Sequence, residues 1–160
     1  MANKVKVTGK SQNRTALGIV HAYCRMEPKT TLESLRKAFP NSVCPDSGVK
    51  ELFLPIKEAE TFNTKMTLYF PKPDEVITLA DGSVIGMAQV WSKSSLDKIT
   101  AQAAKFGIEA TEPDKSVGGA GGFTIECLDG YTFPKAKKGC LGILLLPLIA
   151  AGALAYLLTF

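Results

Sequence analysis

The sequence predicts an α+β fold, in which two N-terminal helices precede an antiparallel sheet with a hairpin and one packed helix, followed by a C-terminal transmembrane helix. Three observations lead to this expectation. Helical periodicity fills residues 15–39, strand patterns surround a turn at Asp81-Gly82, and residues 140–160 carry no charged side chain. Helices and strands that are segregated along the chain are typical of α+β domains, whereas a doubly wound sheet alternates them.

The first elements are a short strand and two helices. Val5 to Thr8 alternates apolar and polar side chains, as a strand does. Apolar spacing predicts a helix over 15–26, which ends before Pro28. Thr30 and Glu33 have the spacing of a capping box, so a second helix is expected over 31–39.

The middle of the chain is predicted to be mainly β-structure. Residues 52–54 and 66–70 resemble strands that nearby prolines confine to sheet edges. The pattern over 76–91 predicts a hairpin, with Asp81-Gly82 as a two-residue type I′ turn.

A further helix and two further strands are expected after the hairpin. Ser94 is the expected cap of the helix, whose apolar face continues to Phe106 and which Gly107 closes. A strand over 108–111 is expected next. Residues 118–122, with four glycines, are interpreted as a flexible joint before an additional strand at 123–127.

The C-terminal segment is predicted to span a membrane. About 20 helical residues rise about 30 Å, which is the thickness of the hydrocarbon core of a bilayer. Pro147 lies one turn into the segment, where a kink is expected. The residues expected to anchor the chain in lipid are Leu141, Leu145, Pro147, Ile149, Ala151, Gly152 and Ala155.

Basic residues next to the predicted span set its expected orientation. Lys135, Lys137 and Lys138 precede it and no charged side chain follows, so the positive-inside bias places the N-terminal domain in the cytoplasm. This layout resembles that of tail-anchored single-span membrane proteins, and the resemblance covers residues 135–160. Ala151 and Ala155 have small-xxx-small spacing, which gives self-association through the span as a hypothesis.

Three regions follow from these expectations: a cytosolic domain over 1–117, a Gly-rich joint with an extra strand and a basic stretch over 118–139, and the span over 140–160. Residues 75–111, with the run Ile77 to Gly82 and then Val90-Trp91-Ser92, resemble a small uncharacterised α+β module of hypothetical bacterial proteins. That module implies no activity.

Charge is unevenly distributed along the chain. The net charge of +4 combines +6 over residues 1–37, −5 over 38–134 and +3 from the three lysines that follow. A basic N-terminal third followed by acidic sequence leaves a nucleic-acid-binding, helix-turn-helix-like domain as an alternative. The second helix, however, has its basic side chains, Arg36 and Lys37, near its C-terminal end rather than at the N-terminal part, which usually contacts bases.

No catalytic or cofactor-binding constellation is predicted. His21 and Cys24 lie one helical turn apart and could bind a metal with Cys44, but no second close pair of ligands accompanies them, so no metal site is predicted. Gly9-Lys10-Ser11 ends like a phosphate loop yet lacks the upstream glycine, so no cofactor is predicted either. Trp91 could anchor a partner, the alternative being a half-buried core tryptophan.

These observations together predict a membrane-tethered cytosolic interaction or sensor module without catalysis of its own. Its expected partners are the lipid bilayer and a protein, including a second copy through the span. In a bacterium this layout would suit a membrane-acting effector or an accessory protein of a defence system.

Overall fold

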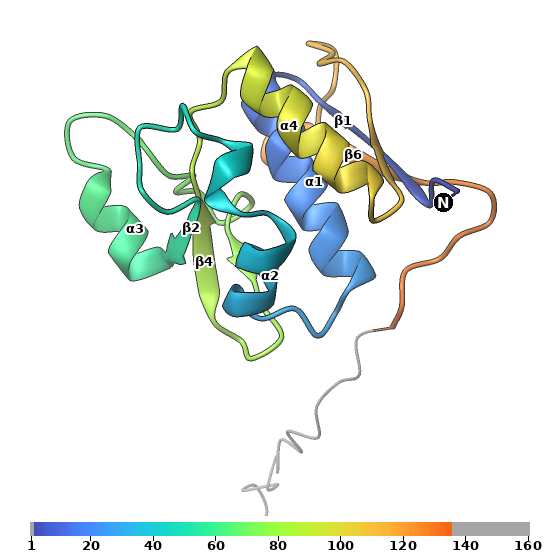
Figure 1. Ribbon diagram of the computed structural model, residues 1–160, viewed down its shortest axis with the longest axis horizontal. Helices are drawn as coiled ribbons and strands as arrows, with labels where there is room; N and C mark the ends of the chain where they lie inside the picture. The colour runs from blue at the N-terminus through green and yellow to red at the C-terminus, as the bar shows by residue number, and fades with distance from the viewer. Residues whose placement is uncertain (1, 136–160) are drawn as a thin grey trace, which may run out of the picture.

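The computed structural model describes residues 2–135, which form four α-helices, two short 3-10 helices and six strands (Figure 1). In chain order these are β1 (Val5–Gly9), α1 (Gln12–Met26), α2 (Leu32–Ala38), η1 (Asn41–Val43), β2 (Phe53–Pro55), α3 (Ile56–Phe62), β3 (Ile77–Thr78), β4 (Val84–Met87), α4 (Lys93–Ala104), β5 (Ile108–Ala110), η2 (Ala120–Gly122) and β6 (Phe123–Cys127).

The first sheet has β1 at its centre, with β5 parallel to it on one side and β6 antiparallel on the other. Val5 and Val7 are fully buried while Lys6 between them is partly exposed, so one face of β1 supports the core. Helix α1 packs closely on that strand. A Cβ added at Gly18 would lie 2.7 Å from Cγ1 of Val7, so the helix and the strand leave no room for a side chain there.

The second sheet is antiparallel, in the order β2-β4-β3, with α3 beside it on the left of Figure 1. An isolated bridge between Tyr69 and Ala88 extends this pairing beyond β4. Gly86 in β4 would place a Cβ 3.0 Å from the Cβ of Ala59, which shows how closely α3 approaches the strand. One apolar cluster, including Val5, Leu17, Phe53 and Ile99, joins the two sheets into a common core.

The α+β class is confirmed, but the predicted architecture was wrong in two respects. The strands form two small sheets, one of them mixed, because α1 and α4 return the chain so that β5 runs parallel to β1. Within residues 2–135, moreover, no helix is both long and apolar enough to cross a bilayer, so the described fold has no transmembrane helix. The segment predicted to span, residues 140–160, lies outside the described residues.

The predictions of two helix caps and of the hairpin turn were also wrong. Ser92, and not the expected Ser94, is the N-cap residue of α4, since its hydroxyl accepts the Ser95 amide. The capping box of α2 uses Thr31 and Ser34, since the Thr31 hydroxyl accepts the Ser34 amide while the Ser34 hydroxyl accepts the Thr31 amide. In the hairpin, Gly82 has a φ of +82°, whereas Asp81 has no positive φ. A type I′ turn needs positive φ at both central residues, so the connection is instead a turn closed by the Gly82 amide on the Leu79 carbonyl.

The end of the glycine-rich segment is packed against the domain. The amide of Gly121 donates to Oδ2 of Asp74 at 2.8 Å, and both Gly121 and Gly122 are buried. This contact places β6 along the whole of β1, with Val5 opposite Cys127 and Gly9 opposite Phe123. The strand predicted over 123–127 is therefore confirmed, and Gly121 and Gly122 before it are held against the domain, while residues 118–120 are exposed.

Candidate functional site

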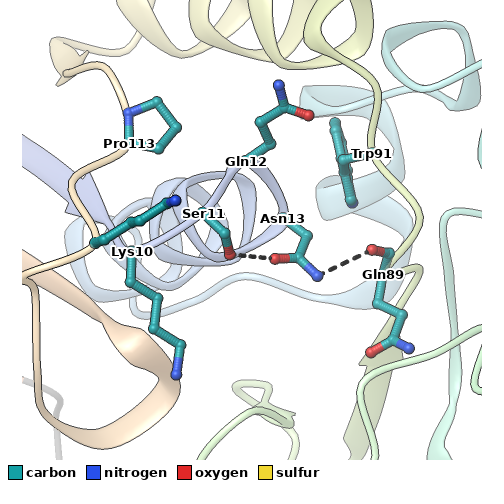
Figure 2. Close-up of a pocket in the computed structure, with 8 residues that line it drawn as sticks. Lys10, Ser11, Gln12, Asn13, Gln89, Trp91 and Pro113 are labelled. Carbon is teal, nitrogen blue, oxygen red and sulfur yellow. Dashed lines mark hydrogen bonds between the residues drawn. The ribbon is translucent and has the colours of Figure 1, made fainter.

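The candidate site is the junction where β1 leads into α1. Gly9 ends the strand so close to the helix that a Cβ on it would lie 2.2 Å from the Thr15 backbone nitrogen. Ser11 is the N-cap residue of α1, but its hydroxyl donates to Oδ1 of Asn13 at 2.6 Å and makes no capping bond. The side-chain amide of Asn13 in turn donates to the Gln89 carbonyl oxygen at 3.3 Å (Figure 2).

A cavity of about 400 Å³ opens at this junction. Three chain segments enclose it, and each comes shortly after a strand: one after β1, one after β4 and one after β5. Since β1 and β5 are parallel, their carboxyl ends meet at the same edge, where α/β sheets commonly bind ligands. The lining residues are Lys10, Ser11, Gln12, Asn13, Gln89, Trp91, Pro113 and Lys115.

The charged residues that line the cavity are both basic, and the stem of Lys10 lies against Gly122. Lys10 and Lys115 are these charged residues, and none of the described residues that line the cavity is acidic. Neither lysine lies within ion-pair distance of a described carboxylate. The carboxylate of the neighbouring Asp114 accepts from the amide and the hydroxyl of Ser116, and these bonds lower the pKa of Asp114. The positive end of the α1 dipole adds to the field of the lysines.

Trp91 forms one wall of this cavity. Its side chain is 8% exposed, and its indole Nε1 donates to the Ala88 carbonyl oxygen at 2.8 Å. Trp91 is thus largely buried with its polar atom satisfied, yet its ring borders the open volume (Figure 2). Partner contact by Trp91 stays a prediction, now with a defined location.

A second cavity of about 500 Å³ lies at the other end of α1, between Cys24, Arg25, Thr78 and Phe133 among others. Arg25 stacks 3.9 Å from the centroid of the Phe133 ring, which fixes the segment after β6 against the helix. Glu27 also lines this cavity, so the negative charge of Glu27 balances the positive charge of Arg25 there. Burial raises the pKa of the Cys24 thiol to about 12, which leaves it protonated and a poor nucleophile at neutral pH.

The side chains considered as metal ligands are engaged elsewhere. Nε2 of His21 lies 3.3 Å from the Glu75 carbonyl oxygen, which can only accept, so this nitrogen carries the proton. Sγ of Cys44 donates to the Val90 carbonyl oxygen at 3.4 Å. Among residues 2–135 no three His, Cys, Asp or Glu side chains gather as metal ligands would.

The environment of His21 leads to a prediction about pH. Burial holds the pKa of His21 below its ordinary value of 6.5, an effect that the bond to Glu75 partly offsets and that Arg25 reinforces. The unfolded chain therefore takes up a proton as pH falls through about 6.5 before the folded chain does, and stability is lost on acidification. We expect His21→Gln, measured by urea denaturation between pH 7.5 and 5.5, to lose less stability than the natural chain. If the difference in unfolding free energy between His21→Gln and the natural chain stays constant from pH 7.5 to pH 5.5, the lowered pKa does not belong to His21.

A largely buried ion pair stabilises the fold next to the candidate site. Arg14, in the first turns of α1, donates to Oε1 of Glu75, and the two side chains are 16% and 2% exposed. Arg14 also donates to the Gly121 carbonyl at 3.2 Å and lies 4.9 Å from the centroid of the Phe70 ring. Oε2 of Glu75 accepts the Lys72 amide at 3.1 Å. The pair thus connects α1 to the segment between the bridge at Tyr69 and β3.

The basic N-terminal third does not form one surface. Arg14 is buried with Glu75, Lys6 lies 3.8 Å from Glu126 on the outer side of the sheet, and Lys4 lies over the Tyr131 ring. In α2, Arg36 donates to the Phe53 carbonyl and Lys37 pairs with Glu33. The helix-turn-helix alternative required these groups for phosphates and bases, whereas the fold engages Arg14 and Arg36 in internal contacts and distributes the exposed lysines over several elements.

Of the predicted juxtamembrane lysines, Lys135 is exposed at the end of the described chain. Lys137 and Lys138 and all the predicted anchor residues lie outside the described residues. Sequence reasoning missed Lys115, Gln89 and Asn13, because nothing in local spacing indicates that the segments after β1, β4 and β5 converge. It noted Gly9-Lys10-Ser11, which do stand between a strand and a helix at the cavity.

Neither protein-family models, nor curated proteins, nor solved structures give a match to this chain.

Proposed function

We propose that this chain is a non-catalytic binding module that holds an anionic group of its partner in the cavity at the N-terminus of α1. The observation that carries the proposal is the cavity's composition, with Lys10 and Lys115 on an otherwise uncharged lining that includes the apolar walls of Trp91 and Pro113. Polar groups that line a concave surface fix the orientation of a ligand, and here six of the eight lining residues are polar or charged.

The arrangement of the polar groups favours binding over chemistry. Ser11 is the sole hydroxyl among the eight lining residues, and it donates to an amide oxygen that cannot take up its proton. Nucleophilic catalysis requires a base next to the nucleophile or a nucleophile with a lowered pKa. Binding an anion through two lysines requires neither a base nor an activated nucleophile.

The test is a titration of the full-length chain with inorganic phosphate, followed through the amide signals of Gln12 and Asn13 and the indole signal of Trp91. We expect saturable shifts with a dissociation constant in the millimolar range. In a double variant Lys10→Gln, Lys115→Gln, we expect affinity to fall at least tenfold, since one hydrogen bond to a charged group contributes about 1.5–3 kcal/mol.

The matched control removes the same charge elsewhere. Lys57 in α3 and Lys98 in α4 are exposed and do not line the cavity. We expect Lys57→Gln with Lys98→Gln to leave phosphate binding within twofold of the natural chain. If both double variants weaken binding equally, the anion responds to net charge alone and the proposed site is wrong.

A further inference from the structure

Three large apolar side chains are exposed in the described chain, and one of them, Val90, lies between two residues that line the cavity. Phe62, Met66 and Val90 are 47%, 65% and 39% exposed. Single exposed apolar residues are ordinary, but several that gather at one place indicate an interaction surface. The positions of these three residues relative to the cavity therefore bear on what this surface binds.

Backbone pairing brings together the segments that carry two of these residues. The Gln89 amide donates to the Leu68 carbonyl at 2.9 Å, and the Gln89 side chain donates to the Thr67 carbonyl. The chain neighbours Met66 and Val90 thus flank this pairing. Phe62 joins them through Tyr69, whose ring centroid is 5.9 Å from its own and which bridges to Ala88.

The same segment lines the cavity. Gln89 and Trp91, on either side of Val90 in sequence, both border the cavity with Lys10 and Lys115. The segment Gln89 to Trp91, which borders the cavity, therefore contains Val90 and pairs with the segment that follows Met66. We refer to Phe62, Met66 and Val90 as the apolar patch. A free phosphate or a nucleic-acid backbone would use the cavity alone, whereas a polypeptide can occupy both parts.

We infer that the apolar patch and the cavity form one docking surface for an extended segment of a partner protein, which places an acidic side chain in the cavity and an apolar side chain on the patch. This inference rests on the proposed function and names its partner class. Charge complementarity requires the acidic residue, because both charged lining residues are lysines. Met66, with a flexible and polarizable side chain, can adapt to apolar residues of different shapes.

The probes are fluorescein-labelled decapeptides of Gly and Ser that carry one Glu and one Leu-Leu pair, placed two to five positions apart. At about 3.3 Å per extended residue, this series covers about 7–17 Å between the acidic and the apolar group. Anisotropy titrations use the full-length chain. We expect at least one spacing to bind tenfold more tightly than the same peptide with Glu→Gln or with Ser in place of both Leu.

Variants of the protein test separately whether the patch binds the leucines and whether the cavity binds the glutamate. In Met66→Ser, Val90→Thr, we expect the full peptide to bind no better than the peptide without leucines, while phosphate binding is unchanged. In Lys10→Gln, Lys115→Gln, it should bind no better than the peptide without Glu. Met66 and Val90 are exposed, and phosphate binding by the patch variant shows that it remains folded.

The outcomes separate this inference from the proposed function. If phosphate binds but the leucines add nothing at any spacing, or no peptide binds at 1 mM, the docking surface is wrong and the anion site stands. If phosphate also fails to bind, both are wrong. If sedimentation velocity shows a dimer that Met66→Ser, Val90→Thr converts to a monomer, the patch is covered by a second copy and the inference is overturned.

Discussion

Replacing Glu75 by Gln is expected to lower the free energy of unfolding by about 3–5 kcal/mol, because it leaves the buried Arg14 guanidinium without a counter-charge. The glutamine keeps the size of the side chain, so the expected loss comes from charge and not from a void. Urea denaturation at pH 7, monitored by the fluorescence of Trp91, gives this free energy directly.

The magnitude follows from where the pair lies. Glu75 is 2% exposed and Arg14 is 16% exposed, so water can replace little of the lost interaction. Arg14 retains the Gly121 carbonyl and the Phe70 ring after the substitution, but neither neutralises its charge. The segments that these contacts hold, the first turns of α1 and the loop before β6, are expected to loosen together.

Two further variants test the interpretation. Lys6→Gln breaks the exposed pair with Glu126, and we expect a cost below about 1 kcal/mol, as for surface ion pairs in general. The double variant Arg14→Met, Glu75→Leu removes both charges and is expected to be more stable than Glu75→Gln alone. If Glu75→Gln costs no more than Lys6→Gln, the pair is effectively solvated and the argument fails.

The elements that local sequence dictates were predicted from the sequence. The helices near 15–26 and 32–38 and the strand at 123–127 depend on apolar periodicity, capping groups and prolines, which act within a few residues. Helix α3 was missed, because Ile56 to Phe62 is short and directly follows Pro55 in a segment with strand signals on both sides. Local sequence signals predict such short elements poorly. Helix α3 is stabilised by its packing against β4.

The partition into two sheets could not be predicted, because it depends on pairings between segments distant in sequence. Val5 pairs with both Ile108 and Cys127, and no local pattern specifies these partners. The same holds for the site. Lys10 and Lys115 approach the same cavity because β1 and β5 are parallel, and Arg14 meets Glu75 across 61 positions of sequence. The helix-turn-helix alternative assigned the N-terminal basic residues to a surface for nucleic acid, whereas Arg14 is largely buried and paired with Glu75.

Replacing Gly9 by Ala is the other substitution with a large expected effect, about 3 kcal/mol of lost stability together with loss of the phosphate response. A Cβ at this position would lie 2.2 Å from the Thr15 nitrogen and 2.6 Å from the Arg14 carbonyl carbon. These are backbone atoms of α1, and a rotamer change cannot move them. Overpacking against flexible side chains typically costs about 1–3 kcal/mol, and a rigid helix places this case at the upper end.

The helix must therefore move away from β1, and this movement alters the site as well as the stability. Ser11 and Asn13 are held by bonds that run from the junction to Gln89, so a displaced first turn separates them from the opposite wall of the cavity. Urea denaturation measures the stability of Gly9→Ala, and a phosphate titration, followed by the indole signal of Trp91, measures the site.

Gly118→Ala is the matched control, because a Cβ there meets nothing within 4 Å and its φ is not left-handed. Reduced freedom of the unfolded chain should make this variant equal to or about 0.4–1 kcal/mol more stable than the natural protein. If Gly9→Ala behaves like Gly118→Ala, α1 can shift without cost and the junction is not rigid. If Gly9→Ala loses stability but keeps full phosphate affinity, the strand–helix contact supports the fold alone, and the binding site must be located away from the first turn of α1.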